Sequence, residues 1–235
     1  MSHRHFIIPA EPTRQQRRLP LVPIALLLAL LTLVALGGTR VTAHQSHTNG
    51  ATEEAKERRV AFHDTMRRLW EDHIVWTRMY LVSAIAELPD TQATAERLLR
   101  NQTDIGDAIR PYYGDAAGDQ LTALLRDHIL IAVDLVAAAK AGDTARLAGE
   151  QSRWEANADA IGAFLNDTNP RHWPRDEMAA MMRTHLEVTA AEALARLRGD
   201  WAADIAAYDA VHEQILRMAD MLSSGIIEQF PEHFR

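Results

Sequence analysis

The sequence predicts an all-α protein, a six-helix bundle built from three αα-hairpin repeats of about 56 residues. After Lys56, apolar residues recur at three- and four-residue spacing almost throughout, and no segment alternates with period two for long enough to form a strand. A similar five-residue string ending in histidine also occurs three times, at intervals of 55 and 57 residues, and this indicates a repeated supersecondary unit. The three strings are LWEDH at 69–73, LLRDH at 124–128 and MMRTH at 181–185.

The N-terminal segment predicts export. Several arginines precede an uncharged run over 19–39, and positive charge before an apolar run keeps that end in the cytoplasm while the following chain crosses the membrane. Residues 1–43 are therefore expected to be a signal peptide, with cleavage after Ala43, or an uncleaved membrane anchor. An uncleaved segment would hold the protein to the membrane through residues 19–38. The remainder is expected outside the cytoplasm, either secreted or periplasmic, or anchored to the cytoplasmic membrane.

The predicted bundle covers residues 57–235 and follows a polar linker at 44–56. Pro89-Asp90, Gly142-Asp143 and Gly199-Asp200 each combine a helix-ending residue with an aspartate suited to N-capping, so tight turns are expected there. Pro111, Pro170 and Pro231 are each expected just after an even-numbered helix. The six helical segments are 57–87, 92–110, 117–141, 144–165, 175–198 and 201–227, which pair as hairpins 57–116, 117–174 and 175–235.

Composition excludes several classes of protein. The chain has no cysteine, which excludes disulfides and metal ligation by thiolate. Without residues 1–43, the chain has 20 basic and 31 acidic residues, a formal net charge of −11. A surface of this charge repels phosphate backbones, so nucleic acid is not an expected partner. There is no nucleophile-elbow pattern, phosphate loop or dinucleotide fingerprint, so a binding role is expected rather than a catalytic one.

The three repeated histidines, His73, His128 and His185, each lie on the apolar stripe of an odd-numbered helix. The even-numbered helices carry Asn101, Asn157 and His212 at intervals of 56 and 55 residues. All six positions lie about 20 Å from the hairpin turns at a rise of about 1.5 Å per residue. The sequence therefore predicts a polar layer through the middle of an apolar bundle.

Two interpretations of this layer remain open. As a site, it would bind a transition metal or a small ligand, because imidazole is the commonest protein ligand for such metals. The candidate ligands are His73, His128, His185 and His212, supported by Asn101, Asp104, Asn157, Asp159, Thr77 and Thr189. As a structural layer, it would only hydrogen-bond internally and fix helix register, in a structural or interaction module of the cell envelope.

Several strings also resemble those of a family of bacterial helical proteins with no assigned activity. The strings are HxxWTR at 73–78, NQxDIG at 101–106 and PYYG at 111–114. The similarity extends over most of residues 70–231 and implies an exported, all-helical bacterial protein. It implies no activity, cofactor or substrate.

Overall fold

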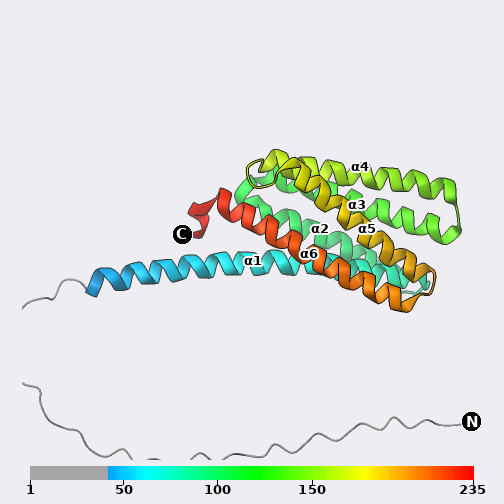
Figure 1. Ribbon diagram of the computed structural model, residues 1–235, viewed down its shortest axis with the longest axis horizontal. Helices are drawn as coiled ribbons and strands as arrows, with labels where there is room; N and C mark the ends of the chain where they lie inside the picture. Colours follow the sequence, from blue (N-terminus) through cyan, green and yellow to red (C-terminus); the bar gives the residue numbers. More distant parts are fainter. Residues whose placement is uncertain (1–41) are drawn as a thin grey trace, which may run out of the picture. The chain divides into compact units, whose positions relative to one another are not determined.

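The computed structural model describes residues 42–235, and for residues 42–51 it describes the backbone alone. The described chain is all-α and forms a bundle of six helices with a short 3-10 turn at its C-terminal end (Figure 1). The elements are α1 (Thr42–Ile85), α2 (Thr91–Tyr113), α3 (Asp115–Ala141), α4 (Thr144–Thr168), α5 (Arg175–Leu197), α6 (Trp201–Gln229) and η1 (Pro231–Phe234).

The helices form a closed ring. Each helix packs against the next one along the chain, and α6 returns to pack against α1. The pairs α1–α2, α3–α4 and α5–α6 therefore surround a common core. This arrangement brings side chains of the odd-numbered helices together, although they lie far apart in the sequence.

The turns at the hairpin tips form as the sequence predicts. Gly142 and Gly199 adopt left-handed conformations with φ of 67° and 69°, which a side chain would disfavour. Each is followed by an aspartate that caps the next helix: Asp143 accepts a hydrogen bond from the backbone N–H of Arg146 at 3.0 Å, and Asp200 accepts one from the N–H of Ala203 at 3.1 Å.

Two predicted boundaries are wrong. Helix α1 begins at Thr42, so the stretch 44–56 is helical and not an irregular linker. Its second half, ATEEAKE at 51–57, consists mainly of residues with high helix propensity. Pro111 lies inside the last turn of α2, which ends at Tyr113. Proline is tolerated there because the helix loses only one hydrogen bond before Gly114 turns the chain directly into α3.

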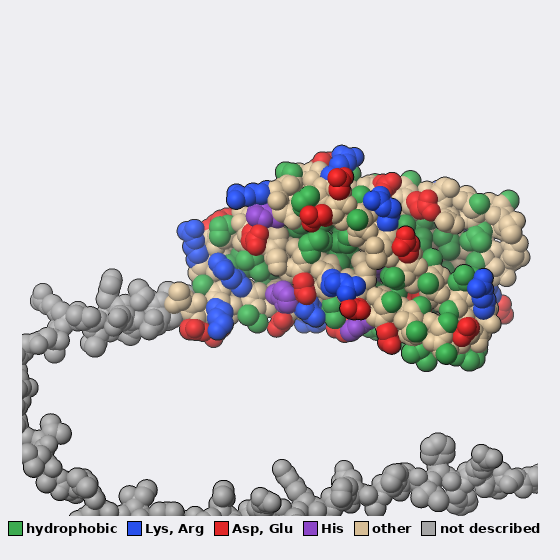
Figure 2. All heavy atoms as spheres, in the orientation of Figure 1, with side chains coloured by type: hydrophobic (Ala, Val, Ile, Leu, Met, Phe, Trp, Pro, Cys, Tyr) green, Lys and Arg blue, Asp and Glu red, His purple; other side chains and the backbone are tan. Residues whose placement is uncertain are grey.

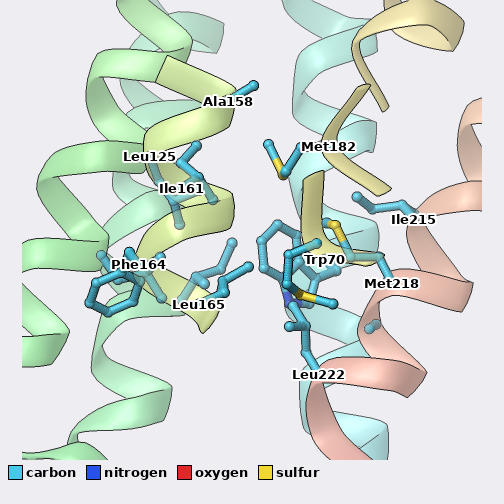
Figure 3. Packing of buried hydrophobic residues seen from close by; sticks show 14 of the residues in the cluster. Trp70, Leu125, Ala158, Ile161, Phe164, Leu165, Met182, Ile215, Met218 and Leu222 are labelled. Carbon is cyan, nitrogen blue, oxygen red and sulfur yellow. The ribbon is translucent and has the colours of Figure 1, made fainter. Parts of the chain in front are cut away.

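The main hydrophobic core receives buried side chains from all six helices. Figure 3 shows Leu125 and Ile161 pointing across the bundle toward Met182 and Trp70. Nearer the hairpin tips the core divides into two smaller clusters, one around Tyr80, Leu98 and Ile129 and one around Leu81, Val136 and Ala193. The core is therefore continuous at the end near η1 and discontinuous toward the tips.

Helices α2 and α3 approach each other closely at a pair of glycines. A Cβ added to Gly106 would lie 2.6 Å from the carbonyl oxygen of Gly118, a distance that requires the backbone to shift. This contact allows the two helices to pack backbone against backbone next to the polar layer.

Within residues 42–235, no helix is long and apolar enough to cross a membrane. The segment 19–38, which the sequence predicts as a membrane-inserting stretch, lies outside the described residues.

Candidate functional site

A buried polar layer crosses the middle of the bundle and contains His73, His128 and His185, here called the histidine trio. Each imidazole is 3–4% exposed and bonds through Nδ1 to an amide oxygen on the other helix of its own hairpin. The partners are Oε1 of Gln102 at 3.2 Å, Oδ1 of Asn157 at 2.8 Å and Oε1 of Gln214 at 3.0 Å. Histidine and amide are 29 residues apart in all three pairs, so the three hairpins repeat the same contact.

The amide nitrogens determine which ring nitrogen carries the proton. The amide of Asn157 donates to the carbonyl oxygen of Leu124, four residues before His128, at 3.0 Å. Gln214 donates in the same way to Met181 at 3.4 Å, four residues before His185. Because each amide presents its oxygen to the ring, each Nδ1 must be the donor, and Nε2 of the neutral ring keeps a free lone pair.

The first hairpin divides this role between two adjacent side chains. Asn101 donates to the carbonyl oxygen of Leu69 at 2.9 Å, and Gln102 accepts from His73. The amide nitrogen of Gln102 donates to Leu98 at 2.8 Å and to Oδ1 of Asn101 at 3.2 Å. Both amides are fully buried, and they complete the layer.

The sequence prediction of this layer is partly wrong. Asn101 and Asn157 belong to it, but His212 does not: its side chain is exposed and pairs with Glu71, with 2.9 Å between Nε2 and Oε1. The buried position on α6 belongs to Gln214, two residues later. Gln102, Asn157 and Gln214 follow one another at 55 and 57 residues, the same intervals as the histidines, so applying those intervals to the even helices would have found them.

The carboxylates and hydroxyls proposed to support the layer are placed differently from one another. Asp104 is half-buried and Asp159 exposed, and neither hydrogen-bonds to the layer among the residues described. Thr77 donates to the backbone oxygen of His73 at 2.7 Å. Thr189 is buried, and its hydroxyl has no hydrogen-bond partner within residues 42–235. Both threonines line a small cavity together with the histidine trio.

The rings of the trio lie close to one another. The ring centre of His185 is 5.8 Å from that of His73 and 6.0 Å from that of His128. Burial lowers the pKa of all three imidazoles, to about 3 for His128, and the nearby ring of His185 lowers the pKa of His73 and His128 further. The trio is therefore uncharged at neutral pH.

Two cavities of about 20 Å³ each adjoin the trio, one on either side of the rings. Each has room for about one water-sized guest, so the layer has no space for an organic ligand. In the part of the chain that the structure describes, no three or more His, Cys, Asp or Glu side chains form a group that could hold a metal ion. The observed layer is thus a hydrogen-bonded His/Gln/Asn layer.

A buried ion-pair network lies beside the layer, toward the hairpin tips. Arg78 on α1 donates to Glu192 on α5 at 2.6 Å and to both oxygens of Asp204 on α6 at 2.8 and 3.0 Å. Arg196 also donates to Asp204 at 3.1 Å. The hydrogen bond from Arg78 lowers the pKa of Asp204, whereas burial raises the pKa of Glu192. The network ties α1 to the third hairpin.

A larger opening lies between α3, α4 and α5 on the tip side of the layer, and we call it the groove. Its volume is about 330 Å³, within the usual range for small-molecule sites. Its walls are mainly leucine and alanine side chains, including Leu135 of α3, Leu147 of α4 and Leu194 of α5. Trp154 also lines it and stacks against His128 of the trio, with 5.2 Å between ring centres.

The groove exists because small side chains face each other where the hairpins diverge. The tips of α3–α4 and α5–α6 point apart in Figure 1, and Ala139, Ala190 and Ala193 line the opening between these hairpins. Methyl groups do not fill the resulting space. Sequence reasoning missed the groove, since its existence depends on the angle between hairpins and not on helical periodicity.

Comparisons with known proteins add no assignment. No protein-family model matches the chain, and no curated protein or solved structure shows significant similarity to it.

Proposed function

We propose that this chain is a small-molecule-binding protein of the bacterial cell envelope, with its ligand in the groove and the His/Gln/Asn layer as the scaffold beneath it. One observation carries the proposal: the groove combines sufficient volume, mainly apolar walls and a few polar side chains at one place. Small-molecule sites typically have this composition. Helical repeats explain the scaffold, because one histidine–amide contact 29 residues long recurs in every hairpin.

The envelope location rests on the basic and apolar N-terminal sequence and on the similarity of the HxxWTR, NQxDIG and PYYG strings to exported bacterial proteins. It is tested by fractionating cells that express the full chain and sequencing the N-terminus of the recovered protein. Protein in the cytoplasmic fraction would overturn this part. An N-terminus at His44 would identify a cleaved signal, and an intact one in the membrane fraction an anchor through residues 19–38.

Binding in the groove is tested by filling it. Ala190 is exposed and lines the groove, whereas the adjacent Ala191 is exposed on the same helix and does not line it. We expect the neutral apolar dye N-phenyl-1-naphthylamine to bind to wild type and to Ala191→Trp, and at least about tenfold more weakly to Ala190→Trp. Dye fluorescence measures the binding, and circular dichroism verifies the fold. Equal binding to both variants, or none to wild type, would overturn the proposal.

A second candidate function is binding of a soft monovalent metal ion, Cu⁺, in one of the cavities next to the trio. It is favoured by the lining of that cavity, where Met66, Met182 and Met218 accompany the three imidazoles and no carboxylate is present. Thioether and imidazole ligands suit Cu⁺, and a single charge costs less to bury than a double one. The free Nε2 lone pairs are available, and the rings must move toward one another to share one ion.

The metal candidate is tested by titration with Cu⁺ under reducing, oxygen-free conditions against a coloured cuprous chelator. Wild type and His212→Gln should withdraw one equivalent of Cu⁺ from the chelator, and His185→Gln and Met182→Leu should not. If wild type withdraws no copper, the metal function is rejected and the layer is structural only.

A further inference from the structure

The charged side chains of the groove are all of one sign. Glu155 on α4 and Glu187 on α5 line it, and no Lys, Arg or His does. Both carboxylates are exposed, and neither forms an ion pair with another side chain that the structure describes. Glu155 accepts one hydrogen bond, from the amide of Gln151 at 3.0 Å, and this amide also lines the groove. Negative charge is thus available to a ligand on two walls of the groove.

The apolar walls and the carboxylates place two different requirements on one ligand. Leucine and alanine side chains of three helices contribute the apolar lining, and burial of an apolar body there is favourable in proportion to its area. A neutral ligand would leave the two carboxylates without a partner, and an anionic ligand would be repelled by them and by a chain whose formal net charge is −7. A cationic end beside the carboxylates satisfies both requirements.

We propose that the groove selects a small amphiphilic cation, an aliphatic or aromatic amine or quaternary ammonium compound, whose apolar body lies among the leucines and whose charged end lies between Glu155 and Glu187. This inference rests on the proposed binding function of the groove and names the chemical class of its ligand. Selectivity arises because a molecule of the same shape without the charge gains only the apolar contacts.

The test compares three probes with the same chain and different ends: n-octylammonium, n-octanol and octanoate. Isothermal titration with the full-length protein at low salt should give affinities in the order ammonium, alcohol, carboxylate. Removing both charges with Glu155→Gln and Glu187→Gln should weaken ammonium binding about five- to twentyfold, two exposed ion pairs being lost, and leave octanol binding unchanged. Salt should weaken ammonium binding and not octanol binding, because salt screens exposed charges.

The control is Glu57→Gln, which removes an exposed carboxylate on α1 away from the groove. It should leave all three affinities unchanged. If it weakens ammonium binding as much as the groove variants do, net charge and not the groove selects the cation, and the inference is overturned. If all three probes bind equally well to wild type, the charge selectivity is wrong while the groove remains a binding site. If none binds, the proposed function fails as well.

Discussion

Acidification should destabilise this protein through the histidine trio, and the size of the effect follows from burial. In the folded protein the pKa of each imidazole lies below the ordinary value of 6.5, and that of His128 is about 3. In the unfolded chain the same side chains take up protons near pH 6.5. The unfolded state therefore binds more protons between these values, and the free energy of unfolding falls as pH falls through this window.

The magnitude at pH 5.5 can be worked out for one ring and multiplied. One pH unit below its unfolded pKa, a histidine that stays neutral in the fold costs about 1.4 kcal/mol of stability. Three such rings together cost about 4 kcal/mol relative to pH well above 6.5. A domain typically has only about 5–15 kcal/mol of total stability, so much of it should be lost at mildly acidic pH.

Urea unfolding followed by far-ultraviolet circular dichroism, repeated between pH 7.5 and 5.5, measures this loss directly. His185→Gln should retain about two thirds of the pH-dependent loss, whatever its stability at pH 7.5, because two buried imidazoles remain. His212→Gln removes an exposed histidine and should keep nearly the full loss. A free energy of unfolding that is flat over this pH range, or an identical loss in wild type and His185→Gln, would refute the assignment of neutral buried imidazoles.

Two further perturbations address the scaffold. Gly106→Ala should cost about 1–3 kcal/mol in urea unfolding, because the new Cβ would lie 2.6 Å from the carbonyl oxygen of Gly118; Gly149→Ala, where nothing lies within 4 Å of the new Cβ, should instead stabilise helix α4 by about 0.5–1 kcal/mol. Arg78→Ala should cost about 3–5 kcal/mol at pH 7, since it leaves two buried carboxylates without their main partner, whereas Arg217→Ala, which removes an exposed pair within one helix, should cost less than about 1 kcal/mol.

Sequence periodicity was sufficient for the helices and for half of the layer. Glycine–aspartate pairs located two tips, because a left-handed residue and a capping side chain are local requirements. The trio was found because each histidine interrupts an apolar stripe. The error at His212 came from aligning the even helices on asparagine, although glutamine supplies the same amide one bond further from the backbone, as Gln102 and Gln214 do.

The groove and the ring closure depend on how hairpins pack against each other, and a single sequence does not encode these angles in its periodicity. Alanines at 139, 190 and 193 read equally well as ordinary helix formers or as small residues at a tight helix contact. The structure shows that they face an opening. Figure 2 shows a related limit, since exposed hydrophobic side chains lie scattered among charged ones over the visible face and do not by themselves indicate a site.

The polar layer constrains each hairpin internally more than it joins the hairpins together. Every histidine–amide hydrogen bond connects two helices of one hairpin, so the layer fixes height within a hairpin and leaves the contact between hairpins to ring packing. The seam between α1 and α6 has additional directional contacts, with Arg67 bonded to Asp220 and His212 to Glu71, and Arg78 joins α1 to α5 and α6 near the tips.

The seam between α4 and α5 differs from the one between α1 and α6. Among the described side chains no ion pair or hydrogen bond links these two helices, and the groove opens along this seam. Apolar contacts are non-directional, so the second hairpin can shift relative to α5 at a lower cost than the first hairpin can shift relative to α6. Trp154 lies at this seam with one side against His128 and also lines the groove. A ligand that entered there would therefore contact the layer through a single indole, and the width of the groove would adjust without breaking any histidine–amide hydrogen bond.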